Sequence, residues 1–426
     1  MKKILLLLCV VVVFLYGCAS EKSSIPETDS AQFPPPEIQK VEPVNPEETA
    51  KEISTIKEAS TTEEATAIKQ DLTEEEIARM TEEMSKAIMD RMFGRGTSQT
   101  ELKEVNCDNA PTQRQFANSP YYNGPLIDDH LHMPFTFELP SAIYQQADWD
   151  APILEKEIFA GDIICGFDKE KINSAFGFYA VPNLLKRQAV QTIQQIEQKY
   201  KGRITPFLMP AHISELDLKP SDVEEILNAN KGLFKGFGEI AFYKGSYKGV
   251  SPDDPSLLEL YKIADKYDLI VMIHPDDGQK KAIERILTEN PNVKFLFHGQ
   301  EIGSHIPSIV SKYPNAYYSI DADLFDIPNE GNSVNLYGSG SKEKFISDYK
   351  RDHDRVLTGA VAMWKSPIEK NPDKFLWGTD RSFDWHFDQE VGAMLEEMGR
   401  EFIGKLDPSI QEKFAYKNAL RVLENE

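Results

Sequence analysis

Residues 269–298 read LIVMIHPDDGQKKAIERILTENPNVKFLFH. The apolar runs 269–274 and 293–298 have the length of buried strands, and between them the apolar residues of 280–288 recur at helical spacing. A strand, a helix and a second strand in this order form the repeating unit of a parallel sheet. Each run ends on a histidine, so His274 and His298 would lie at the same edge of that sheet.

The same alternation continues through residues 121–426. Further apolar runs that predict strands lie at 126–128, 176–181, 204–211, 234–240, 316–320 and 374–378. Further helical patterns lie at 184–200, 256–266 and 306–313. Eight strands that alternate with helices predict an α/β fold, a closed (β/α)8 barrel. An open doubly wound sheet is the alternative, but it would carry a glycine-rich phosphate loop after its first strand, and the sequence has none there.

The composition narrows the range of functions. The chain has 426 residues, with 47 Lys and Arg against 69 Asp and Glu, and its formal net charge is −22. Clustered basic residues hold nucleic acid, so this acidic chain is not expected to bind it. With 41% hydrophobic residues, the chain has enough apolar material for a large core. Its four cysteines are too few to staple a disulfide scaffold.

The N-terminus predicts export. Residues 1–17 resemble a bacterial secretion signal, in which two lysines precede a short apolar run. The run ends at Gly17 and Cys18, a pattern that resembles the lipobox of bacterial lipoproteins. The resemblance implies cleavage before Cys18, lipidation of its thiol and anchoring to a membrane of the bacterial cell envelope. Ala19 favours the outer membrane in a Gram-negative host. A plain signal peptide with an incidental cysteine is the alternative.

Three segments fall outside the strand and helix alternation. Residues 18–70 are rich in proline and acidic residues and predict a disordered tether. Residues 71–120 predict a helical arm, because apolar residues recur at helical spacing in its first part. The long polar stretch 321–370 predicts an insertion or lid of the barrel. Cys107 and Cys165 would either form a disulfide in an oxidising compartment or remain two buried thiols.

Ligand-type side chains follow one predicted strand after another. His130 and His132 close the first strand, and in an extended chain this spacing turns both imidazoles to the same side. The other strand ends carry Glu239, His274, His298 and Asp380. Barrel enzymes build their sites at the C-terminal ends of the strands, so these side chains are expected to meet there. Imidazoles and carboxylates together suit a divalent metal such as zinc.

This ordered set resembles a known family. His-x-His, Glu, His, His and Asp on strands one, four, five, six and eight are similar to the amidohydrolase superfamily, and more narrowly to its amidohydrolase 2 group, over about 125–423. The resemblance implies one or two divalent metal ions, with zinc expected. The implied ligands are His130, His132, Glu239, His274, His298 and Asp380.

The resemblance also implies roles for single residues. Asp380 would bind metal and accept the proton of the activated water. His298 would bind a second metal or act as acid or base on the substrate, so these two are the expected catalytic residues. Glu239 would either bridge two metals or support Lys244 beside a single metal. The residues expected to contact substrate are His212, Lys244, Arg381 and Trp385.

The expected function is that of a lipid-anchored metal-dependent hydrolase, in which metal-activated water attacks a small-molecule ester, lactone or amide. A metal-dependent decarboxylase of a small unsaturated or aromatic carboxylic acid is the first alternative. A TatD-like nuclease is disfavoured by the acidic charge. A catalytically silent binding lipoprotein is the last alternative, against which the complete ligand set argues.

Overall fold

The computed structural model describes residues 107, 120–134, 158–212, 217–327 and 333–424. The predicted signal at 1–17, the lipidation site Cys18 and the predicted tether at 18–70 lie outside the described residues. So does the predicted helical arm at 71–120, apart from Cys107 and Pro120.

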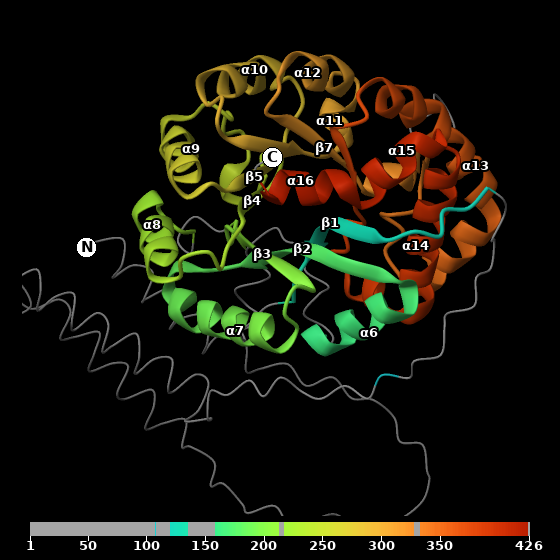
Figure 1. Cartoon of the computed structure of the whole chain (residues 1–426), viewed down its shortest axis with the longest axis horizontal. Coiled ribbons are helices and arrows are strands. Elements are labelled where there is room, and N and C mark those ends of the chain that lie inside the picture. Colours follow the sequence, from blue (N-terminus) through green and yellow to red (C-terminus); the bar gives the residue numbers. More distant parts are fainter. Residues whose placement is uncertain (1–106, 108–119, 135–157, 213–216, 328–332, 425–426) are drawn as a thin grey trace, which may run out of the picture. The chain divides into compact units, whose positions relative to one another are not determined.

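Parallel strands form one 8-stranded sheet, in which every neighbour in the sheet is also the next long strand in the chain (Figure 1). The strands are β1 (Leu126–His132), β2 (Ile172–Ala180), β3 (Ile204–Met209), β4 (Gly236–Ala241), β5 (Ile270–His274), β6 (Lys294–Phe297), β7 (Ala316–Ile320) and β10 (Phe375–Trp377). Each of them overlaps a predicted strand, which confirms the predicted (β/α)8 barrel.

Backbone hydrogen bonds close the sheet between β1 and the segment that follows β10. The N–H of Asp380 donates to the carbonyl of His130 at 2.8 Å, and the N–H of His132 donates to the carbonyl of Arg381 at 3.1 Å. The side chain of Asp128 adds a third link, because it accepts from the backbone N–H of Thr379 at 2.9 Å. The closure therefore places the ends of the first and last strands side by side.

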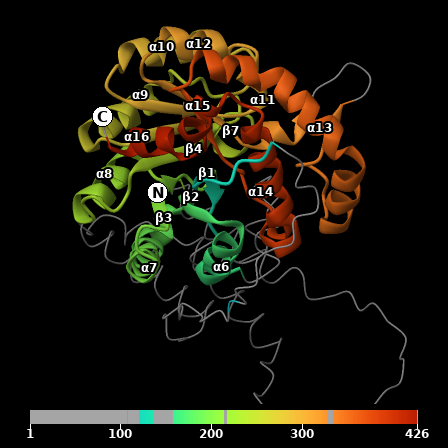
Figure 2. The same ribbon diagram turned by 45° about the vertical axis from the view of Figure 1, so that its right-hand side comes forward.

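Helices surround the strands in both views (Figures 1 and 2). Those between strands are α6 (Ala160–Glu170), α7 (Lys186–Lys199), α8 (Pro220–Ala229), α9 (Pro255–Tyr267), α10 (Lys280–Glu289), α11 (Gln300–Gly303), α12 (Ile306–Lys312) and α13 (Lys342–Lys370). The chain ends in α14 (Gln389–Gly404), α15 (Pro408–Glu412) and α16 (Asn418–Glu424). Among the described helices, none has the length and hydrophobicity needed to cross a bilayer.

Large apolar side chains fill the barrel interior. This cluster contains Ile127, Phe176, Phe178, Ala180, Phe207, Met209, Ile270, Met272, Leu296, Leu376, Ala419 and Val422. The last two come from α16, and the ammonium of Lys294 at the start of β6 donates to the carbonyl of Val422 at 2.7 Å. Helix α16 therefore packs against the N-terminal ends of the strands, which leaves the C-terminal ends for the functional side chains.

The stretch 321–370, predicted to be an insertion or lid, is mostly a helix of the barrel. After a short antiparallel pair, β8 (Asp326–Ile327) with β9 (Val334–Asn335), the 29-residue α13 fills the place between β7 and β10. Its buried side includes Trp364, whose ring stacks on Tyr318 of β7 at 5.2 Å between centroids. The outer side of this long helix is charged, which gives the stretch its polar composition. That composition is the reason why the stretch was predicted to be an insertion or lid.

A disulfide joins Cys107 to Cys165 of α6, with the Cα atoms 5.5 Å apart. The sequence left this pairing open, because bridging depends on a distance that spacing alone does not provide. The bond ties Cys107 to α6.

Candidate metal centre and active site

The structure brings the six predicted ligands together at the C-terminal ends of the strands. Their ligand atoms form three groups within which all atoms lie within 4.8 Å of one another. The groups are His130, His132 and Glu239; Glu239, His274 and His298; and His130, His298, Asp321 and Asp380. The first two share Glu239, and the third adds Asp321, which was not among the predicted ligands.

Glu239 stands between two pairs of histidines. Its Oε2 lies 3.3 Å from Nε2 of His132 and 3.9 Å from Nε2 of His130. Its Oε1 lies 3.0 Å from Nε2 of His298 and 3.2 Å from Nδ1 of His274. The carboxylate is buried, and its two oxygens therefore face different imidazole pairs. This geometry is typical of a carboxylate that bridges two metal ions.

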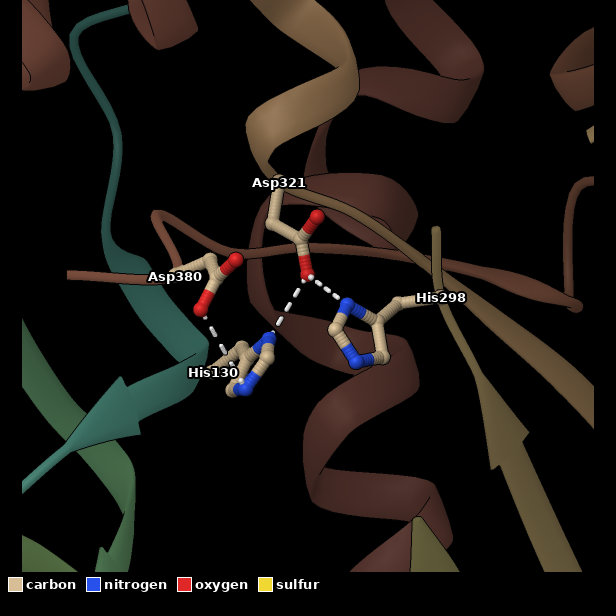
Figure 3. A group of neighbouring side chains, drawn as sticks. All are labelled: His130, His298, Asp321 and Asp380. Atoms are coloured by element: carbon tan, nitrogen blue, oxygen red, sulfur yellow. Dashed lines mark hydrogen bonds and ion pairs between the residues drawn. The ribbon is translucent and has the colours of Figure 1, made fainter. Parts of the chain in front are cut away.

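Asp321, which directly follows β7, orients two of the imidazoles (Figure 3). Its Oδ2 lies 2.8 Å from Nδ1 of His130 and 3.4 Å from Nδ1 of His298. Both rings consequently turn Nε2 toward Glu239, as expected of outer carboxylates that hold metal-binding histidines. Asp321 was not among the predicted site residues, because it was assigned to the insertion. Its position after a strand was the signal that could have found it.

Asp380 completes the cluster from the segment after β10. Its Oδ1 lies 3.2 Å from Nε2 of His132 and 3.5 Å from Nε2 of His130. Its backbone has φ 49°, a left-handed conformation that costs free energy in a non-glycine residue. The N–H bond to His130 and a hydrogen bond from the Tyr337 hydroxyl to the carbonyl of Asp380, 2.5 Å long, hold it there. Tyr337 was not among the predicted site residues.

The side chains present fit a divalent metal. Nε2 of His130 is buried and has no hydrogen-bond partner among the described residues, although it faces carboxylates on two sides. A buried polar nitrogen of this kind is costly unless something binds it. Imidazole nitrogens and carboxylate oxygens are ligands of zinc and of neighbouring transition metals. The donor set therefore supports a metal centre without identifying the element.

Charges in the cluster are strongly coupled. Burial opposes protonation of His132, but Asp380 and Glu239 outweigh it and raise the pKa of His132 to about 9. Burial also opposes ionisation of Glu239, and the neighbouring His298 and Lys244 outweigh that effect, so the pKa of Glu239 lies well below its ordinary value. The metal-free cluster thus holds protonated imidazole beside ionised carboxylate, and a metal ion would have to displace protons.

Metal affinity is therefore expected to rise with pH. Below about pH 9, binding at His132 releases its proton, so the dissociation constant should fall about tenfold per pH unit for each proton displaced. Zinc titrations in competition with a chelator, between about pH 6 and pH 8, would measure this slope. In the variant His132→Gln, the logarithm of the zinc dissociation constant should change by about one unit less per pH unit than in the wild type. An affinity independent of pH in the wild type would contradict the proton competition.

Two of the four predicted substrate contacts reach the pocket at this site, which has a volume of about 510 Å³. His212, at the end of β3, and Lys244, in the loop after β4, line it. The structure places Arg381 and Trp385 elsewhere, because neither is among the residues lining the pocket. Arg381 forms a buried ion pair with Glu170 of α6, at 2.6 Å.

Trp385 is 5% exposed and packs on aromatic neighbours, with its ring stacked on Phe383 at 5.6 Å between centroids. Adjacency to Asp380 in the sequence suggested a substrate contact for Arg381 and Trp385. The chain turns at Asp380, and both side chains pack into the protein instead. The pocket wall also contains residues that were not predicted to belong to the site, among them Tyr243, Tyr337 and Phe383.

The fold and the site together define a (β/α)8-barrel enzyme with a metal-binding cluster at the C-terminal ends of its strands. The chain belongs to the amidohydrolase family, because the model of that family, described as Amidohydrolase, matches residues 166–424. The family is metal-dependent and includes hydrolases and decarboxylases. The match confirms the predicted enzyme class. The matched region begins at residue 166, after β1, so the assignment of His130 and His132 to the site is supported by their positions in the structure and not by the family match.

Solved structures similar to this chain include an uncharacterised TIM-barrel protein from Bordetella bronchiseptica, at 14% identity and TM-score 0.44, covering 70% of this chain and 98% of that one. A probable 2-pyrone-4,6-dicarboxylic acid hydrolase from Acinetobacter baumannii has 12% identity and TM-score 0.42, covering 70% and 98%. A 5-carboxyvanillate decarboxylase from Novosphingobium aromaticivorans, complexed with manganese, has 12% identity and TM-score 0.40, covering 71% and 96%. A comparison with curated proteins found no match.

Proposed function

We propose that the chain is a hydrolase of a small-molecule ester, lactone or amide that depends on two divalent metal ions, with zinc the expected element. The observation that carries the proposal is the position of Glu239, whose two oxygens face two separate pairs of histidines. His130, His132 and Asp380 would hold one ion, and His274 and His298 would hold the other. The pocket of about 510 Å³ beside them is of a size suited to a small molecule.

The mechanism follows from the residues at the pocket. When bound, divalent metal ions lower the pKa of water and polarise a carbonyl group. Burial opposes ionisation of Asp380, but His130 and His132 outweigh it and lower the pKa of Asp380 below its ordinary value. Asp380 is therefore an ionised carboxylate that can accept the proton of an attacking water and return it to the leaving group. Tyr337 and the backbone of His130 keep it in place.

A metal-dependent decarboxylase is the second candidate. The observation that favours it is the aromatic part of the pocket wall, formed by Tyr243, Tyr337 and Phe383, which suits the ring of an aromatic acid. Following carbon dioxide and hydrolysis products in parallel, over panels of esters, lactones, amides and aromatic acids, would separate the two reactions.

Metal content provides the test of the two-metal site. The wild type should bind two zinc ions per chain, and Glu239→Gln should bind at most one, because the amide cannot bridge two cations. Loss of a ligand should weaken the remaining site by at least about 100-fold, since loss of an outer hydrogen-bond partner alone costs about 10- to 100-fold. Elemental analysis after dialysis against buffered zinc measures both quantities.

The matched control is Glu301→Gln. Glu301 lies 3.0 Å from the other nitrogen of His274 but belongs to none of the three ligand groups. At saturating zinc this variant should keep two ions per chain, with an affinity lowered by no more than about 10- to 100-fold, the cost of losing an outer partner. One ion in both the wild type and Glu239→Gln would contradict a bridge and favour a single-metal enzyme.

We further propose that the protein is anchored by lipid at Cys18 in the bacterial cell envelope. The support is the lipobox-like sequence at residues 15–18 together with the disulfide between Cys107 and Cys165, since disulfides persist in oxidising compartments outside the cytosol. The wild type expressed with its own signal should sediment with membranes, and Cys18→Ser should be released into the soluble fraction. Equal partitioning of the two would contradict the anchor.

A further inference from the structure

One part of this acidic chain carries a surplus of positive charge. Three segments at the junctions between a helix and the next strand, 167–171, 196–203 and 228–235, hold seven basic residues against three acidic ones, although the whole chain has a net charge of −22. We call these seven the basic patch: Lys169, Lys171, Lys199, Lys201, Arg203, Lys231 and Lys235. They lie at the N-terminal ends of β2, β3 and β4, at the opposite end of the barrel from the metal-binding cluster.

The three segments are neighbours in the fold. β2, β3 and β4 are adjacent in the sheet, and α6, α7 and α8 follow one another around it in Figure 1. The guanidinium of Arg203 donates to the carbonyl of Asn173 at 2.8 Å, which links the start of β3 to that of β2. The backbone N–H of Lys235 donates to the carbonyl of Pro206 at 2.9 Å, which links the start of β4 to β3. Since adjacent strands are about 5 Å apart, the basic side chains share one side of this end of the barrel.

Neighbouring groups account for only part of this charge. Of the three acidic residues, Glu170 is buried in the ion pair with Arg381, and Asp168 pairs with Arg203 at 2.8 Å. Basic residues in the last turn of a helix also offset its dipole, which explains those in the last turns of α6 and α7. Four lysines beyond the helix ends are exposed and form no ion pair with any residue that the structure describes, namely Lys171, Lys201, Lys231 and Lys235. These four remain for an anionic partner.

The disulfide lies beside the basic patch. Cys165, which is bonded to Cys107, precedes Lys169 by four residues on the same face of α6, a rise of about 6 Å. The sequence before Cys107 leads back to the proposed lipid anchor at Cys18, so the disulfide attaches the anchored part of the chain next to the patch. A domain attached in this way meets the membrane at a high effective concentration, and a weak electrostatic contact is then enough to orient it.

We propose that the basic patch binds an anionic phospholipid surface, and that this contact turns the mouth of the pocket away from the bilayer toward the aqueous phase. The proposal rests on the proposed lipid anchor. Lysines close to an anionic leaflet attract its headgroups, whereas the net negative charge of the chain is repelled by it. The anchor therefore supplies attachment and the patch supplies orientation. Without the anchor the contact is too weak to hold the domain during cell fractionation, in keeping with the release expected of Cys18→Ser.

Cosedimentation of the full chain carrying Cys18→Ser with vesicles tests the patch without the lipid. At about 0.05 M salt, where screening extends over more than about 10 Å, the protein should bind vesicles of phosphatidylglycerol and phosphatidylcholine in equal parts and should not bind phosphatidylcholine alone. Lys201→Gln, Lys231→Gln and Lys235→Gln together should lower this binding about fivefold for each lysine, or about 100-fold in all. Arginine at the same three positions should preserve it, because the charge is kept. Salt at about 1 M should abolish it.

The matched control combines Lys219→Gln, Lys248→Gln and Lys281→Gln, which remove equal charge from exposed positions at the pocket end of the barrel and should leave vesicle binding unchanged. An equal loss in this control, or no binding of the protein to the anionic vesicles, would overturn the proposal. Tighter binding to a DNA oligonucleotide than to the vesicles would overturn it in favour of a nucleic-acid site. Cell fractionation of the wild type tests the anchor by itself, so a soluble wild type whose patch still binds vesicles would overturn the anchor and not the patch.

Discussion

The variant Asp380→Asn is expected to lower kcat/KM by about 10²- to 10⁴-fold, which is the usual contribution of general acid and base catalysis. Asparagine keeps the shape of the side chain and tolerates the left-handed backbone at φ 49°. It also preserves the hydrogen bond from the backbone N–H of residue 380 to the carbonyl of His130. It cannot accept a proton. The fold and the backbone at the site should therefore survive while the proton transfer is lost.

Turnover of the best substrate from the ester, lactone and amide panel measures this effect. Because Asp380 also faces His130 and His132, metal content must be determined for each sample, and rates are compared per metal-loaded chain. The matched control is Asp326→Asn, which removes a pocket carboxylate outside the three ligand groups and should change kcat/KM only a few-fold. A fully loaded Asp380→Asn enzyme with undiminished kcat would remove Asp380 as the proton acceptor.

The barrel was predictable because its strands carry two independent signals. Each strand is a short apolar run. Several of these runs end on a ligand-type side chain such as His274 or His298, which marks the C-terminal end of the strand. The fold then brings these residues together without further information. The i, i+2 spacing of His130 and His132 likewise places both imidazoles beside Glu239.

Other parts of the site depend on contacts that leave no local pattern. Asp321 carries the strand-end signal directly after the correctly predicted strand at 316–320, but the polar residues that follow it led to its assignment to the insertion. Tyr337 reaches Asp380 from a segment 43 residues earlier in the chain. Arg381 pairs with Glu170, which lies 211 residues away, so its neighbour in the sequence, Asp380, was a misleading guide to its environment.

The ion pair of Arg381 with Glu170 is expected to dominate the stability of this side of the barrel. Both side chains are almost fully buried, and the guanidinium reaches both carboxylate oxygens, at 2.6 and 3.3 Å, and the carbonyl of Gly392 in α14. Arg381→Met leaves the carboxylate buried without its cation, so the free energy of unfolding should fall by about 3–5 kcal/mol. Urea denaturation of the metal-free proteins measures the change.

The double variant Glu170→Met with Arg381→Met separates the pair from its packing. Two apolar side chains of similar volume remove both charges together, so the double variant should regain most of the lost stability. A double variant as unstable as the sum of the single changes would mean that the hydrogen bond of Arg381 to Gly392, and not the ion pair, holds α6 and α14 to the barrel.

One combination of results would restore the substrate contact that the sequence predicted for Arg381. If Arg381→Met left the unfolding free energy unchanged and raised KM for a carboxylate substrate, the guanidinium would have to leave Glu170 and turn into the pocket during turnover.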